Sequence, residues 1–163
     1  MQSATYFLAL LVSYSGLIAG IAIAYSAKEE LATGKRYFAM LQKALLAAVV
    51  AISLNHLGIP LALRKIAYAL IILLLASKYE LDSSIAYGIL GAAFFLSRNT
   101  QDTFFVISAL IFIYGLSTGS IAVEENLKDA RKGKFGFCKI TVRKGLANNI
   151  SFIAAAALPG ILF

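Results

Sequence analysis

The side chains best suited to chemistry lie where apolar segments of the sequence begin or end. They are Asn55, His56, Arg64, Lys65, Arg98 and Asp102. Three of the six, Arg64, Lys65 and Arg98, are positively charged, so the first hypothesis is an outer vestibule that attracts an anion. A structural alternative stays open. In it, Arg98 pairs with Asp102, while Arg64 and Lys65 extend their charged ends into water.

Other kinds of chemistry have few residues to use. The chain has one cysteine, Cys138, and one histidine, His56. An intramolecular disulfide is therefore excluded, and zinc or haem has almost no ligands. No Asp or Glu stands near the middle of an apolar segment, where proton-driven pumps usually carry one. We expect neither an enzyme nor a bound cofactor.

The elements that must position these residues are membrane helices. Of the 163 residues, 60% are hydrophobic and 14% are charged, and the mean hydropathy is +0.82. A soluble domain carries about 25% charged residues, so the outer surface of this chain must face lipid. A spanning helix needs about 20 residues. The sequence predicts an all-α integral membrane protein, a bundle of six helices over 5–26, 37–57, 61–77, 83–96, 103–123 and 146–163.

The distribution of basic residues predicts the orientation of these helices. Eleven of the 15 Lys and Arg residues lie in 27–36, 77–82 and 124–144, and three lie in the segments on the other side. Because cytoplasmic segments are enriched in Lys and Arg, we expect a multi-pass protein of the cell membrane with both termini extracytoplasmic. The most basic segment, 128–144, is expected to attract anionic lipid headgroups. Without a recognisable nucleic-acid module around it, nucleic acid is not an expected partner.

Small residues recur at the spacing that lets membrane helices pack closely. Gly16 and Gly20 lie four apart, and the same signature returns 99 positions later at Gly115 and Gly119. Further identities at this offset predict two parallel copies of one helical hairpin, 2–64 and 101–163, flanking a divergent central hairpin, 65–100. A third small-residue face is predicted within 83–96. It consists of Ser84, Gly88 and Ala92.

Charged residues follow two of the predicted spans. We expect the first helix to continue past residue 26 until Gly34, and the fifth to continue past residue 123 until Gly133. Glu29 and Glu30 lie in the first extension, and Glu124 and Glu125 in the second. The simplest interpretation of both is a solvated helix end.

Two functions remain open from the sequence. One is a small channel or facilitator for a small solute or ion. The other is a structural or accessory subunit of a membrane complex, with a second copy of the chain or another membrane protein as partner. A continuous polar stripe through the bilayer would favour the first. The sequence supplies only part of one, from Ser117, Thr118, Ser120, Asn148 and Asn149.

Overall fold

The computed structural model of the protein describes residues 3–27, 29, 31–76, 82–131, 152 and 154–156, and the regular elements within them are all helical. Three helices are long and apolar enough to cross a membrane, over Ala4–Ser26, Thr33–His56 and Gln101–Glu125. The predicted helical membrane class is therefore confirmed at this level. Most of the predicted span 146–163 lies outside the described residues, as does the basic segment beyond residue 131.

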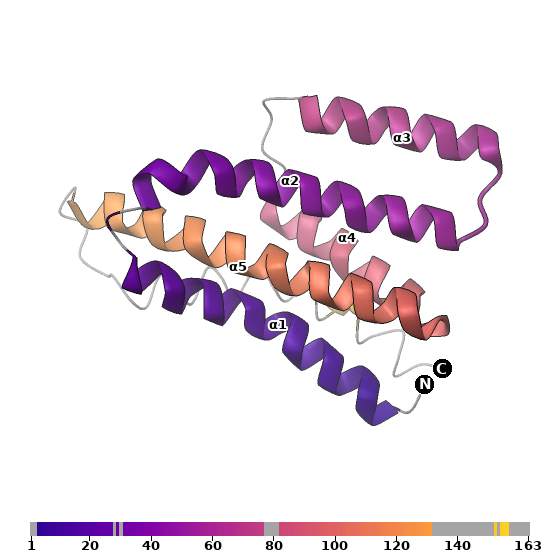
Figure 1. Ribbon diagram of the computed structural model, residues 1–163, viewed down its shortest axis with the longest axis horizontal. Coiled ribbons are helices and arrows are strands. Elements are labelled where there is room, and N and C mark those ends of the chain that lie inside the picture. The colour runs from indigo at the N-terminus through magenta and orange to yellow at the C-terminus, as the bar shows by residue number, and fades with distance from the viewer. Residues whose placement is uncertain are drawn as a thin grey trace.

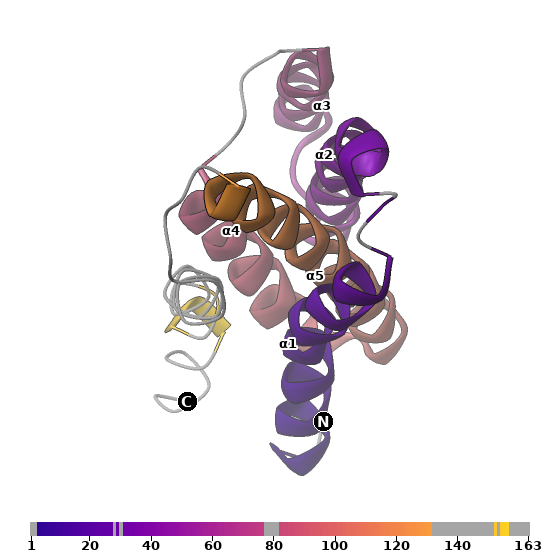
Figure 2. The same ribbon diagram turned by 90° about the vertical axis from the view of Figure 1, so that its left-hand side faces the viewer.

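Helix α5 (Gln101–Arg131) is the centre of the bundle, and α1 (Ser3–Ser26) lies along it. Figure 1 shows α1 and α5 side by side, and Figure 2 shows α5 between α1 and α2 (Leu31–His56). Gly16 of α1 meets Phe112 of α5, and Gly20 meets Leu116, so the two helices run parallel. A parallel pair is the arrangement that the proposed repeat requires. Most of the second helix of the second copy lies outside the described residues.

The predicted extension of α1 to Gly34 is wrong, because α1 ends at Ser26 and α2 begins at Leu31. The reason is the burial of Leu31, which is 5% exposed and packs with Ala24 and Val123. A straight continuation of α1 would carry Leu31 away from this cluster. By contrast, α5 does continue without a break to Arg131, as expected for the second extension.

Helices α2 and α3 (Leu61–Ala76) form an antiparallel hairpin. Gly58 has a φ of +61°, a conformation that favours glycine, and it reverses the chain after α2. The carbonyl of Pro60 accepts from Arg64 N at 3.1 Å, which starts α3. This places the first turn of α3 beside the last turn of α2.

Helix α4 (Ser83–Leu96) has the predicted bounds, and the side chain of Asp82 caps its N-terminus by accepting from Ser84 N at 3.3 Å. Its predicted packing face is not the face that the structure buries. Ala92 is exposed, and a Cβ at Gly88 would meet nothing within 4 Å. The buried glycine is Gly91, where a Cβ would lie 2.7 Å from Phe152 O.

Large side chains decide which face of α4 is buried. Its buried residues include Tyr87, Leu90 and Phe94. These follow the three- and four-residue spacing of one helix face, and they bury far more surface than the stripe of small residues. The ring of Phe94 lies 4.9 Å from that of Phe104 and 5.1 Å from that of Tyr6, measured between centroids. This aromatic cluster joins α1, α4 and α5.

Candidate functional site

The helices α1 and α5 approach so closely that their backbones touch. A Cβ on Gly16 would overlap the carbonyl oxygen of Phe112, and a Cβ on Gly115 would lie 2.8 Å from Leu17 N. Gly20 and Gly119 stand in the same contact one turn further on, where a Cβ on Gly119 would lie 2.7 Å from Ile21 N. This contact fixes the depth at which polar side chains of the two helices meet.

Ser13 and Ser108 form the first polar level inside this contact. Ser13 Oγ donates to the carbonyl oxygen of Ser108 at 3.2 Å, and Ser108 Oγ donates to the carbonyl oxygen of Phe104 at 2.7 Å. Both serines are buried. Their hydroxyl protons are therefore used within the bundle, as is usual for serines in membrane helices.

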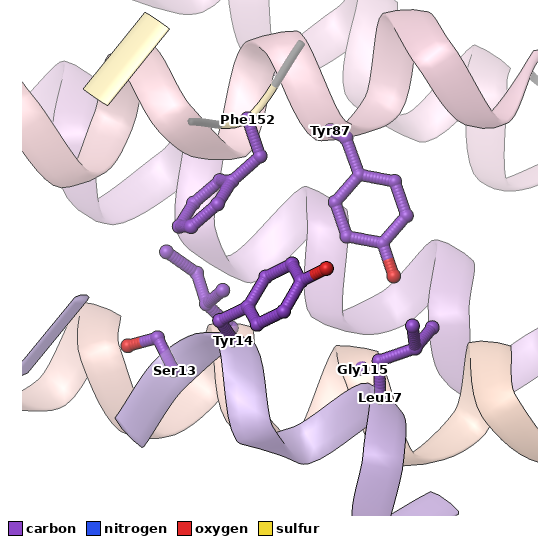
Figure 3. A pocket seen from close by; sticks show the side chains of 7 residues that line it. Ser13, Tyr14, Leu17, Tyr87, Gly115 and Phe152 are labelled. Atoms are coloured by element: carbon purple, nitrogen blue, oxygen red, sulfur yellow. The ribbon is translucent and has the colours of Figure 1, made fainter. Parts of the chain in front are cut away.

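A small cavity of about 10 Å³ lies next to Ser13, between α1, α4 and α5. It is lined by Tyr14 and Tyr87, among others, and Figure 3 shows both phenol rings beside this space with their hydroxyls at its edge. A cavity of about 10–15 Å³ holds one water molecule. The volume is therefore at the lower limit for a single water molecule.

Gln42 makes the next polar contact toward the end of the bundle where α1 ends and α2 begins. Its Nε2 donates to Thr118 Oγ1 at 2.8 Å, and Thr118 Oγ1 donates to the carbonyl oxygen of Tyr114 at 2.9 Å. The ring of Tyr114 packs edge-on against that of Tyr87 at 5.5 Å between centroids, which connects this contact with the cavity. We call Ser13, Tyr14, Gln42, Tyr87, Ser108 and Thr118 the intramembrane polar cluster.

Sequence reasoning identified Thr118 but missed Gln42, Tyr14 and Tyr87 as neighbours of it. Gln42 could have been found, since a primary amide within an apolar segment of membrane length is costly and usually has a partner on another helix. The two tyrosines carried no such signal, because tyrosine is a common residue of membrane proteins, enriched where helices meet the membrane surface.

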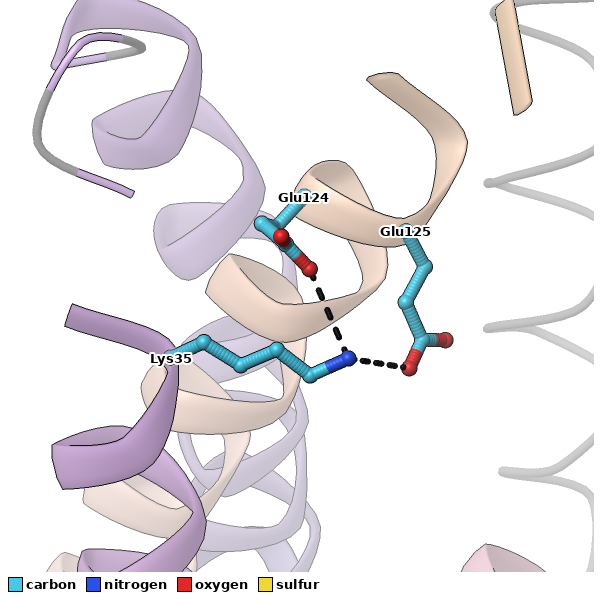
Figure 4. Close-up of polar contacts among 3 residues, drawn as sticks. All are labelled: Lys35, Glu124 and Glu125. Carbon is cyan, nitrogen blue, oxygen red and sulfur yellow. Dashed lines mark hydrogen bonds and ion pairs between the residues drawn. The ribbon is translucent and has the colours of Figure 1, made fainter. Parts of the chain in front are cut away.

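An ion pair joins α2 and α5 at one end of the bundle. Lys35 Nζ lies 3.5 Å from Glu124 Oε2 and 3.1 Å from Glu125 Oε1 (Figure 4). The interpretation of this segment as a solvated helix end is wrong for Glu124, which is only 3% exposed. Its burial follows from the turn after α1, which packs Leu31 and Ala24 against neighbouring Val123. Glu125 is exposed, as expected.

The opposite end of the bundle holds the residues predicted to form the outer vestibule. Asn55 Oδ1 accepts from Arg64 Nη1 at 3.4 Å and from the Tyr68 hydroxyl at 2.9 Å. His56 belongs to a separate contact, with its Nε2 at 2.7 Å from Thr100 Oγ1. The structure thus brings Asn55 together with Arg64, and His56 together with the turn before α5.

Arg98, Asp102 and Lys65 do not join these contacts. The Arg98 guanidinium lies over the Phe95 ring at 5.1 Å from its centroid, a cation–π contact within one turn of chain. The structural alternative paired Arg98 with Asp102, and the structure gives Arg98 this aromatic partner instead. Asp102 and Lys65 are exposed.

Within the described part of the chain, no group of three or more His, Cys, Asp or Glu side chains is arranged to hold a metal ion. Comparison with protein-family models, with curated proteins and with solved structures finds no match for this chain.

Proposed function

We propose that the protein is a small channel or facilitator, without enzymatic activity, that lets a small solute or ion cross the cell membrane. The observation that carries this proposal is the intramembrane polar cluster. It draws side chains from α1, α2, α4 and α5 to the interior of an apolar bundle, with Gln42 Nε2 donating to Thr118 Oγ1 at 2.8 Å. Polar side chains are costly in a bilayer and commonly mark the path of a solute.

The hydroxyl groups of α5 point to several sides of the helix, and those of Ser108 and Thr118 belong to the intramembrane polar cluster. Ser108, Ser117, Thr118 and Ser120 each donate to a backbone carbonyl oxygen of the preceding turn. With the proton used in this way, a hydroxyl group can still accept a hydrogen bond from a solute, although Thr118 Oγ1 already accepts one from Gln42 Nε2. The solute class that best fits an acceptor-rich path is a small molecule or ion that donates hydrogen bonds, such as water, ammonium or a small polyol.

The proposed topology is six spans with both termini extracytoplasmic, built from two parallel hairpins around the central one. The three long helices and the parallel contact of α1 with α5 support it. In this orientation the pair of Lys35 with Glu124 and Glu125 faces the cytoplasm, and Arg64 faces the outside. The topology is tested by introducing one cysteine at a time into each loop of a variant that lacks Cys138. A membrane-impermeant thiol reagent then shows on which side of the membrane each loop lies.

Transport is tested in proteoliposomes loaded with purified protein. Stopped-flow light scattering would follow water, glycerol and urea, and a pH-sensitive dye would follow ammonium. The test variant is Gln42→Leu combined with Thr118→Val. The matched control is Ser15→Ala, because Ser15 is an exposed hydroxyl on α1 that donates only to Val12 O.

We expect one solute of the panel to cross selectively, and its flux to fall about tenfold in the double variant. Tenfold corresponds to about 1.4 kcal/mol, the scale of one interior hydrogen bond. Ser15→Ala should keep the wild-type flux. Both proteins should remain folded, since an interhelical hydrogen bond in a membrane stabilises by about 0.6 kcal/mol on average. Liposomes as tight as protein-free ones to every solute would contradict the proposal.

The alternative function is an accessory subunit, and one observation favours it. Helix α3 exposes Ile66, Leu70 and Leu73 by 58%, 61% and 66%, respectively, and packs mainly on α2. Such a face can receive another membrane helix as readily as lipid. Mild-detergent purification from native membranes would decide this. A stoichiometric partner that is lost when Leu70 and Leu73 are replaced by Gln supports the accessory function.

A further inference from the structure

We propose that the outer end of the α2–α3 hairpin binds an anionic phospholipid, with the phosphate group at Arg64 and Lys65 and an acyl chain along the outward face of α3. This surface is separate from the intramembrane polar cluster. The proposal therefore does not depend on transport, and a measurement of lipid binding alone decides it.

Arg64 is the residue that carries the charge of this surface. It is half-buried, and its Nη1 donates to the neutral amide oxygen of Asn55 at 3.4 Å. That oxygen also accepts from the Tyr68 hydroxyl at 2.9 Å, so the amide is held from two sides. Among the described residues, the ion pairs found involve Lys35 and not Arg64. The guanidinium is thus oriented by a group that does not neutralise it.

A positioned guanidinium that has no carboxylate partner in the described part of the chain suits an anion with several oxygens. Arg presents five N–H donors in a planar fork that matches a phosphate group, and only one donor is used by Asn55. Lys65, the next residue of α3, is exposed and adds a second positive charge. Both charges stand at the end of the span Thr33–His56, where a phospholipid headgroup lies.

The exposed apolar face of α3 accounts for the rest of a lipid molecule. Lys65 borders this face, whereas Arg64 starts on the side of α3 that meets Asn55 of α2. Ile66, Leu70 and Leu73 lie on one face of α3 by their four- and three-residue spacing, and all three are more than half exposed. Ten residues of helix, from Lys65 to Leu75, rise about 15 Å. The hydrocarbon core of one leaflet is also about 15 Å thick, half of the bilayer core. The charged and apolar parts thus have the spacing of a headgroup and its acyl chain.

This combination favours a lipid over a soluble anion or a protein. A soluble phosphate would use Arg64 and Lys65 but not the apolar face. A membrane helix would use the apolar face but leave the guanidinium at the headgroup level without an anionic partner. An anionic phospholipid satisfies both requirements at once.

The binding test uses the full chain in a neutral detergent. Native mass spectrometry would count bound phosphatidylglycerol and phosphatidylcholine with identical acyl chains, and circular dichroism would record the unfolding temperature with each lipid. The test variants are Arg64→Gln and Lys65→Gln. The matched control is Arg98→Gln, because it removes the same charge at the same end from a side chain seated over the Phe95 ring.

We expect phosphatidylglycerol to bind more tightly than phosphatidylcholine and to raise the unfolding temperature. Each test variant should weaken this binding about fivefold, the equivalent of about 1 kcal/mol per charge near the membrane surface. Arg98→Gln should leave it unchanged. If Arg64→Gln fails to fold, Lys65→Gln still decides the question, since Lys65 is exposed.

Three results would overturn the proposal. Equal binding of the two lipids would remove the role of the charge. Equal weakening by Arg98→Gln would reduce the effect to general surface charge. If inorganic phosphate or glycerol phosphate alone raises the unfolding temperature as much as phosphatidylglycerol does, Arg64 and Lys65 bind a soluble anion and not a lipid.

Discussion

The α1–α5 pair and the α2–α3 hairpin are both helix contacts in the same bundle, but they are built in opposite ways. Between α1 and α5, glycines remove side chains until backbone meets backbone, as at Gly16 and Phe112. Between α2 and α3, polar groups meet at one end, at Asn55 and Arg64, while large apolar side chains of α3 point outward.

The difference shows which interactions stabilise a contact between two membrane helices. Lipid is as apolar as leucine, so burying Leu or Ile against another helix gains little over leaving it in lipid. Close backbone approach and interhelical hydrogen bonds do stabilise the contact, because lipid cannot replace them. The α1–α5 contact uses close backbone approach, whereas the α2–α3 contact uses hydrogen bonds at its end and leaves its apolar face to the bilayer or a partner.

The largest effect should come from placing a side chain in the tight contact. Gly16→Leu would force α1 and α5 apart, because even a Cβ overlaps the carbonyl oxygen of Phe112. We expect a loss of about 3 kcal/mol or more in the free energy of unfolding, or failure to fold. Circular dichroism at increasing denaturant in detergent would measure it, since the chain has no Trp to report by fluorescence.

The matched control for Gly16→Leu is Gly88→Leu. A Cβ at Gly88 meets nothing within 4 Å, so the first atom added there does not force two helices apart. Equal losses at Gly16 and Gly88 would mean that helix backbone effects, and not the close approach, explain the first result.

Helix α4 sharpens the comparison on a smaller scale. Gly91 and Gly88 lie three residues apart, yet a Cβ at Gly91 would come 2.9 Å from Ala155 Cβ. Gly91→Ala should therefore destabilise by about 1–3 kcal/mol. Gly88→Ala should be neutral or stabilise by up to about 1 kcal/mol through helix propensity. Thermal unfolding of the two variants side by side checks this, and the reverse order would show that the Ser84–Gly88–Ala92 face is the packed one.

The same two glycines show what could be predicted from the sequence. The bounds of α4 follow from the capping Asp82 and the apolar run, both of which are local signals. Its buried face was predicted incorrectly, because the glycine spacing was given more weight than the bulk of Tyr87 and Phe94. The helical membrane class was equally accessible, since composition alone decides it.

Contacts between distant helices were harder to predict. The turn before Leu31 depends on Val123, 92 positions further along the chain, and no local signal near Ser26 reports it. The burial of Glu124 follows from that turn and was missed for the same reason. The sequence indicates that Gln42 needs a hydrogen-bonding partner, because an amide inside an apolar span is costly without one. It does not identify Thr118 as that partner.

The smallest effect should come from the outward face of α3. Leu70→Ala removes a side chain that is 61% exposed in the isolated chain, and lipid fills the space that it leaves. We expect a change within about 0.5 kcal/mol in the free energy of unfolding in detergent. The same truncation at Leu90 of α4, which is 0% exposed, should cost about 2 kcal/mol because a cavity remains there. A loss at Leu70 as large as that at Leu90 would mean that α3 is covered by protein. Since the described part of the chain leaves that face open, the covering protein would be a second copy or another subunit, and the loss should then depend on protein concentration.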